Sequence, residues 1–204
     1  MRNNLYTATN SDTASMGIFT YENDNGLPGI TSLTFRHTRM KEGFDLDYCH
    51  ELVTLNFPNV VRIEGNEEGG TDTYFYLQDN TSLTSLLMPE LIFSTNFEIE
   101  SCALPSITLP KLERVNWYFS IYGNDSLVTV SLPNLISASY FFYITNNNSM
   151  TTIDLPSMVA TSEEGFSAGF RVQNNSSFTT LNVPVLERIG SNVVVITERC
   201  IQRD

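Results

Sequence analysis

The chain is poor in positive charge and has no long apolar run. Lys and Arg together number 11 against 23 Asp and Glu, which gives a formal net charge of -12. Nucleic-acid phosphates and anionic membrane surfaces both require clusters of Lys and Arg, so we expect no nucleic-acid partner. A bilayer-spanning helix needs about 20 apolar residues. No segment of the sequence approaches that length, so we expect no membrane insertion.

Cysteine and histidine are also scarce. The 3 cysteines form an odd and sparse set, unlike the framework of a small disulfide-stapled domain. The two histidines, His37 and His50, belong to no motif with a known catalytic role. Glu98 and Glu100 share a strand face, but carboxylates on an open strand lack the desolvation that tunes an acid and a base apart. We therefore expect a protein that is not an enzyme and has neither cofactor nor metal; a glycosidase or lyase is the less favoured alternative.

The overall composition indicates a folded chain. The sequence has 204 residues, of which 41% are hydrophobic and 17% charged. A chain of this kind can bury a substantial core and is not a disordered acidic tail. Its first residues, MRNNLYTATNSDTASMGIF, contain no apolar run of the secretory-signal type. We expect either a mature chain or a protein that is not exported by that route.

The sequence repeats one phrase seven times, with apolar residues spaced LxxLxL and usually closed by proline. The apolar positions suit a short strand entered through a bend, and proline ends the strand because it has no N–H for a ladder. Such repeats predict units that stack on their neighbours. The steps between closing positions are 22, 31, 21, 23, 23 and 28 residues. The closing positions are Arg36, Pro58, Pro89, Pro110, Pro133, Pro156 and Pro184.

A second strand is expected later in each unit, where Phe is followed two residues on by Leu, Ile or Val. Period-two spacing turns both side chains inward, so Phe should stack on Phe between units. With two strands and about 23 residues per unit, little room is left for a helix. Three residues after each pair stands a short side chain that can bond the backbone of a tight inner turn. These residues are Cys49, Asn80, Cys102, Asn124, Asn147 and Asn175.

The stretch LVTVSLPNLISASYFFYITNNN has strand, LP, turn, second strand and Asn in that order. It resembles the leucine-rich repeat of receptor L-domains and of related fungal and microbial cell-surface proteins, over roughly residues 30 to 197. The resemblance implies an all-β, right-handed β-solenoid that recognises proteins or glycans, in an extracellular or cell-surface location. The sequence lacks the Cys-rich modules that accompany L-domains in animal receptors. The expected function is therefore adhesion or recognition by a binding module.

The chain divides into an N-terminal cap and a repeat region within one domain. The cap comprises residues 1–29, and the L-domain-like solenoid of about seven coils comprises residues 30–204. The two longest steps insert the acidic loops GNEEGGTD and SEEGFSAG before a second strand. We interpret both as solvated loops in preference to Ca²⁺ sites, because the DxDxDG spacing is missing.

The outward positions of the second strands supply candidate binding residues. Rigid aromatic rings with a polar tip suit sugar rings or a protein hot spot, and neighbouring carboxylates add polar contacts. The alternative is an ordinary sheet surface, in which Tyr is favoured by strand packing alone. The binding hypothesis assigns the ligand contacts to Tyr76, Trp117, Tyr118, Tyr122, Tyr143, Glu98 and Glu100.

Two other functions are compatible with the repeat. Thr54, Thr129, Thr152 and Thr180 occupy one outward position of the first strands, and ranks of Thr on a flat β-face are used by ice-binding solenoids. The simpler interpretation is a solvated strand of small hydroxyl residues. Open strand edges at the ends of a solenoid invite association. A possible end-to-end homo-oligomer, or a structural subunit of a filament, is therefore the third hypothesis.

Overall fold

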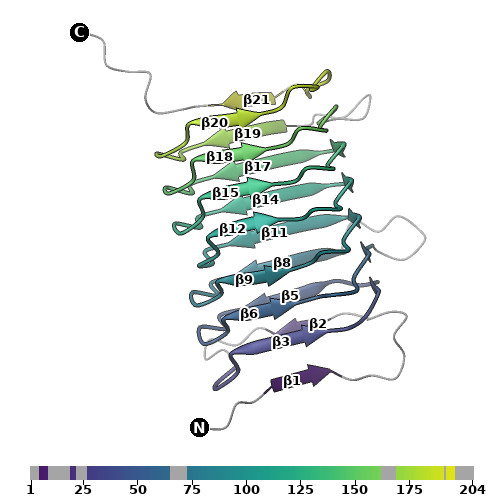
Figure 1. Ribbon diagram of the computed structural model, residues 1–204, viewed down its shortest axis with the longest axis vertical. Coiled ribbons are helices and arrows are strands. Elements are labelled where there is room, and N and C mark those ends of the chain that lie inside the picture. The colour runs from purple at the N-terminus through teal and green to yellow at the C-terminus, as the bar shows by residue number, and fades with distance from the viewer. Residues whose placement is uncertain are drawn as a thin grey trace.

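The computed structural model describes residues 5–8, 19–21, 27–64, 73–161, 169–190 and 192–195. Within these residues every regular element is a β-strand, and no helix occurs. The strands stack one above another from β1 (Leu5–Ala8) to β21 (Asn192–Val195), as Figure 1 shows. The prediction of an all-β fold is confirmed. The parallel strands form four sheets, an arrangement compatible with a β-solenoid.

The repeated phrase forms the first strand of each unit. These seven strands, together with β1 from the N-terminal segment, pair in parallel and make two separate four-stranded sheets. One sheet contains β1, β3 (Ser32–Phe35), β6 (Thr54–Asn56) and β9 (Ser85–Leu87). The other contains β12 (Ser106–Thr108), β15 (Thr129–Ser131), β18 (Thr152–Asp154) and β20 (Thr180–Asn182).

The second strands form a continuous parallel sheet of eight strands on another side of the stack. In spatial order they are β2 (Phe19–Tyr21), β5 (Phe44–Asp47), β8 (Tyr74–Gln78), β11 (Asn96–Glu100), β14 (Tyr118–Tyr122), β17 (Phe141–Thr145), β19 (Gly169–Gln173) and β21.

The expectation of two strands per unit was wrong for five of the units, because a third, short strand lies there at the corner between the two; the last two units have only isolated bridges at Ala160 and Arg188. The corner strand covers the apolar positions that follow the closing proline, such as Val115 in β13. Two residues suffice to pair with the neighbouring units, so these corners form a five-stranded sheet. Its strands are β4 (Arg39–Met40), β7 (Arg62–Ile63), β10 (Phe93–Ser94), β13 (Arg114–Val115) and β16 (Ser137–Ala138).

The core is built from like side chains stacked in register, as the period-two spacing predicts. Phe44, Phe75, Phe97, Phe119 and Phe142 are each 0% exposed. With Phe170 they form one column whose successive ring centroids lie 5.0 to 5.5 Å apart, with interplanar angles of 7 to 17°. Burial of an aromatic side chain gives a large hydrophobic gain. The column therefore ties each unit to both neighbours.

A ladder of buried amides connects the turns after the second strands. Asn147 Oδ1 accepts the backbone N–H of Asn124 at 2.9 Å, and Asn147 Nδ2 donates to Ile121 O at 3.1 Å. Asn175 does the same for Asn147 and Ile144 one unit later. Each amide thus satisfies a donor and an acceptor of the preceding unit, which fixes the register between turns.

Cys49 and Cys102 occupy the same ladder position as the amides and are buried free thiols. Their backbone N–H groups donate to Asn80 Oδ1 and Asn124 Oδ1 at 2.9 and 2.8 Å. Burial is the main reason that the pKa rises to about 11 for the Cys49 thiol and to about 12 for the Cys102 thiol. Both therefore stay protonated at neutral pH, which is the unreactive form of a thiol.

The residue immediately before each ladder position has a left-handed backbone. Gly123 has φ +66°, and non-glycine residues hold the same region in the other turns at a modest conformational cost. The buried amide ladder compensates for this cost. These non-glycine residues are Tyr48, Asp79, Ser101, Asn146 and Asn174, with φ of 51 to 60°.

The sheet of first strands is divided at Pro105. In other units the residue at this position donates its backbone N–H to the preceding unit, as Thr84 does to Val53 O at 3.0 Å and Val128 does to Pro105 O at 2.9 Å. Proline has no N–H, and its ring carbon occupies the place of the missing hydrogen. Among the described first strands that follow one another, only β9 and β12 therefore fail to pair.

The two ends of the stack differ in what covers the core. At the N-terminal end, β1 pairs with β3 and β2 pairs with β5, so the expected cap continues two of the sheets; most of residues 1–26 lies outside the described part. At the C-terminal end Leu181, Val183 and Leu186 are only partly buried. The residues at the same positions one unit earlier, Ile153, Leu155 and Met158, are 0% exposed. The core positions of the last described unit are therefore less well covered than those of the unit before it.

The amide ladder generates a stability prediction. Replacing Asn147 with Ala leaves the Asn124 N–H and the Ile121 carbonyl buried without their partner. Each such group costs about 1–3 kcal/mol, so urea unfolding should show a loss of about 2–4 kcal/mol for Asn147→Ala. Asn148→Ala removes the same side chain from the exposed neighbouring position and should cost much less. Equal losses in the two variants would contradict a structural role for the ladder.

Candidate functional site

The outer face of the eight-stranded sheet carries two parallel rows of side chains. Parallel pairing places identical strand positions side by side. One row contains Asp45, Tyr76, Glu98, Ser120, Tyr143 and Arg171. The other contains Asp47, Gln78, Glu100, Tyr122, Thr145 and Gln173.

Five aromatic rings meet where β14 and β17 begin, and we call them the aromatic cluster: Trp117, Tyr118, Tyr140, Phe141 and Tyr143. The Trp117 and Tyr140 centroids are 4.9 Å apart, and those of Tyr118 and Phe141 are 5.1 Å apart in a stacked arrangement. Phe141 contacts Tyr140 edge-on at 4.5 Å and Tyr143 at 4.9 Å. The rings thus hold one another in fixed positions at the surface.

A glycine and an arginine position the last ring of the cluster. Gly169 is the neighbour of Phe141 on β19. A Cβ at Gly169 would lie 3.0 Å from Cε1 and Oη of Tyr143, so glycine gives this ring its room over the strand, and a larger residue would require the ring to shift by a few tenths of an ångström. On the same sheet, Cζ of Arg171 lies 5.0 Å from the Tyr143 ring centroid, within range of a cation–π contact.

Tyr76 is not part of the aromatic cluster, because its hydroxyl is directed to the acidic end of the sheet, which we define as the outward carboxylates Asp45, Asp47, Glu98 and Glu100 on β5 and β11. Its Oη lies 3.0 Å from Gln78 Oε1 and 3.3 Å from Glu100 Oε2. Burial, followed by the negative charge of Glu100, raises the pKa of Tyr76 above its ordinary value. The phenol therefore stays a hydrogen-bond donor to the carboxylate at physiological pH.

Within its row, Glu98 is the residue of the acidic end nearest to the aromatic cluster. It follows Tyr76 in its row and precedes Ser120 and Tyr143. Burial, with a further contribution from the charge of Glu100, raises the pKa of the Glu98 carboxyl. Burial also raises the pKa of Tyr118, helped by Tyr140 and by the negative charge of Glu98. A ligand on the cluster would therefore meet an acidic group at its edge.

The structure brings together three of the seven predicted binding residues, Trp117, Tyr118 and Tyr143. Tyr122 is 44% exposed on β14 but belongs to the other row, outside the described ring contacts of the cluster. Tyr140 and Phe141 were missed because they precede the Phe that marks the second strand. The run YFFY at residues 140–143 was the available signal.

Asp45 and Asp47 lie on the outer side of the eight-stranded sheet but are nearly buried. Their positions alternate with those of Phe44 and Leu46, yet they are only 6% and 8% exposed. Period-two spacing determines the side of a sheet on which a residue lies, but burial depends on what packs over that side. These carboxylates are therefore not available as freely exposed ligand contacts.

The predicted threonine face is divided. Thr129, Thr152 and Thr180 are neighbours in register, whereas Thr54 lies in the other sheet beyond the break at Pro105. In the next outward row, Asn182 Nδ2 donates to Asp154 Oδ1 at 2.6 Å. Only one row of threonines is therefore continuous, and it covers three neighbouring strands. Ice binding stays a prediction.

No group of three or more His, Cys, Asp or Glu suited to a metal ion occurs in the described part of the chain. The first acidic loop, residues 65–72, lies outside the described residues, and so does the second apart from Gly169 at its end. Glu64 directly precedes the first loop. Glu64 itself forms ion pairs with Arg39 and Arg62.

Comparison with known proteins found no matching protein-family model, curated protein or solved structure. None of the described residues belongs to a helix long and apolar enough to cross a membrane.

The raised pKa of Glu98 generates a pH-dependent prediction. Because folding favours the protonated carboxyl, its stabilising contribution is complete below the ordinary pKa of about 4.3 and is lost as pH rises through the folded pKa. Glu98→Gln should therefore melt a few degrees higher than the original protein near pH 7, with little difference near pH 4. Glu113→Gln, at an exposed position, should melt like the original protein at both pH values. A pH-independent gain in Glu98→Gln would contradict this assignment.

Proposed function

We propose that this protein is a non-enzymatic binding or adhesion module that recognises a protein or glycan at a cell or particle surface. The observation that carries the proposal is the aromatic cluster on an open sheet face. Tyr118 is 36% exposed, and Trp117, Phe141 and Tyr143 are partly exposed. Rings that are already ordered lose little conformational entropy on binding, which favours their use as anchors.

The chemistry around the cluster suits a ligand with apolar faces and hydroxyl or cationic groups. Tyr118 and Tyr140 add hydroxyl groups to the ring surfaces, and Glu98 adds an acceptor at the edge. The net charge of -12 favours neutral or cationic partners over anionic ones. The Cys49 and Cys102 thiols are buried and protonated, so neither of these two offers a nucleophile for catalysis.

The wider setting of this function is also a proposal. We infer a right-handed solenoid of about seven coils, of the receptor L-domain-like class, that acts in an extracellular or cell-surface location. The support is the recurrence from unit to unit of a first strand, a corner that usually begins with proline, a second strand and a ladder residue, which is Asn or Cys. Stacked repeats present extended surfaces, which suits recognition of large ligands.

The binding proposal is tested by screening the protein against a glycan array and a library of extracellular protein domains. Tyr118→Ala should weaken capture of the ligand about tenfold or more, as expected for a central aromatic anchor. Tyr122→Ala is the matched control, because it removes the same residue type from the same strand at 44% exposure. Equal loss in both variants, or no loss in Tyr118→Ala, would remove the aromatic cluster from the proposal.

End-to-end self-association stays a prediction, supported by the open C-terminal unit. Val185, Ile189 and Val193 are 44 to 48% exposed there, beside the partly buried core positions of the same unit. Sedimentation velocity should show a mass that increases with protein concentration in the original protein. Ile189→Lys should shift the equilibrium to the monomer because it places a charge in an apolar contact. A concentration-independent monomer would contradict self-association.

A further inference from the structure

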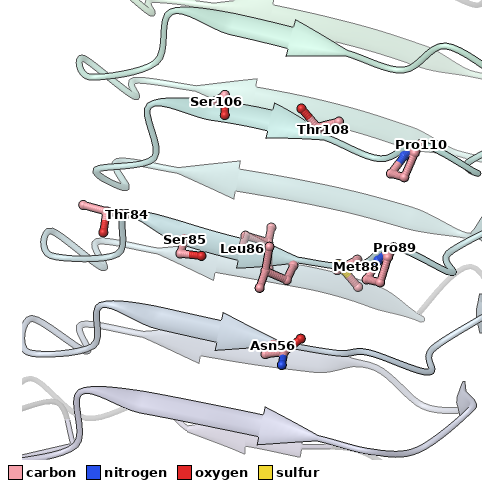
Figure 2. Close-up of a pocket in the computed structure, with 10 residues that line it drawn as sticks. Asn56, Thr84, Ser85, Leu86, Met88, Pro89, Ser106, Thr108 and Pro110 are labelled. Carbon is pink, nitrogen blue, oxygen red and sulfur yellow. The ribbon is translucent and has the colours of Figure 1, made fainter.

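The gap between β9 and β12 forms a groove on the first-strand side of the molecule. It has a volume of about 400 Å³, near the lower end of the range of ligand pockets. Figure 2 shows Ser106, Thr108 and Pro110 along one side and the segment from Thr84 to Pro89 along the other. The groove lies on different strands from the aromatic cluster, so the two sites are separate.

Both sides of the groove present strand edges whose backbone groups have lost their expected ladder partners. Ser85 N–H donates to Val53 O, and Leu87 O accepts from Phe57 N–H, so both residues face β6. Alternation along a parallel strand then turns the N–H and C=O of Leu86 toward β12.

The opposite edge is identified in the same way. Leu109 N–H donates to Ser131 O, so Leu109 faces β15. The alternate residues Thr108 and Ser106 therefore turn their N–H and C=O groups toward β9. Backbone donors and acceptors thus line both edges of the groove.

The break also opens an apolar floor. Leu86 occupies a core position, yet it is only partly buried, whereas Leu55 and Ile107 in the adjacent units are 0% and 2% exposed. Next to it, Leu87 is 49% exposed where the neighbouring first strands carry Asn or Thr. Exposed leucine side chains beside open strand edges favour contact with an aliphatic group.

The lining of the groove indicates the class of ligand. It contains no Asp, Glu, Lys or Arg, although the protein carries a net charge of -12. A neutral ligand is therefore favoured, because a charged one would lose hydration without gaining an ion pair. No aromatic ring lines the groove to stack on a sugar. A peptide with aliphatic and uncharged polar side chains matches both the floor and the edges.

We propose that this groove binds a short, extended, uncharged peptide segment of a partner protein. The peptide backbone bonds the open groups of Leu86, Ser106 and Thr108, and an aliphatic side chain packs on Leu87. The strands that flank β9 and β12 along the chain remain paired, β8 with β11 and β10 with β13, so the coils that contain β9 and β12 stay adjacent on both sides of the gap. The peptide therefore enters the groove between the two open edges without separating the units.

The proposal is tested with an array of uncharged seven-residue peptides. The original protein should retain a subset rich in aliphatic residues. Pro105→Thr restores the backbone N–H at position 105 with the residue type found at Thr84, Thr151 and Thr179. It should close the groove and weaken binding of that subset about tenfold or more, which corresponds to about 1.4 kcal/mol. Because the ladder is repaired, this variant should unfold at higher urea concentration, which separates loss of binding from loss of folding.

Two further variants complete the test. Leu87→Thr places the residue of the Thr108 position on the groove floor and should also lose the peptides. Tyr118→Ala leaves the groove unchanged and should keep them, so failure of the groove and failure of the aromatic cluster can be told apart. On binding, amide exchange should slow at Leu86, Ser106 and Thr108. Absence of peptide binding, equal binding by Pro105→Thr, or protection confined to the eight-stranded sheet would overturn the proposal.

Discussion

In-register stacking of similar units is the constraint on which the rest of this structure depends. Each unit leaves the N–H and C=O groups of its strands and the apolar faces of its side chains unsatisfied, and only a neighbour in the same register completes both. The buried amides set this register at the turns, since Asn147 bonds the backbone of the unit before it and receives the same bonds from Asn175. The phenylalanine column then follows, because paired strands place like positions one above another.

The candidate sites lie where a unit departs from this pattern. Gly169 replaces a strand side chain and lets the Tyr143 ring settle beside Phe141. Pro105 replaces a donor residue and divides the sheet of first strands. A regular repeat satisfies its own backbone and core completely, so it offers a partner only its outward side chains. The irregular positions expose rings, backbone groups and core leucines that a ligand can use.

Electrostatics separates the two surfaces further. The aromatic cluster has acidic side chains near one edge, with Glu98 and Glu100 on the same sheet. The groove at Pro105 is lined without any acidic or basic side chain in a strongly acidic protein. The two sites therefore favour ligands of different character, and a partner on one face leaves the other accessible.

The sequence by itself determined the repeat, the all-β class and the inward positions. Phe97, Ile99 and Asn124 were assigned correctly because local spacing decides which side chains a strand turns inward and which residue ends at the turn. The corner strands escaped prediction, since two-residue strands have too little periodicity to be read.

Only the tertiary structure decided which outward residues come together. It joined Tyr140 and Phe141 to the predicted Tyr118, directed Tyr76 to Glu100 and covered Asp45. It also showed that the sheet of first strands is interrupted at Pro105, between β9 and β12. The physical reason is that each of these outcomes depends on the neighbouring units: a strand sequence specifies its own faces, whereas contacts between strands depend on which residues the stacking places beside them.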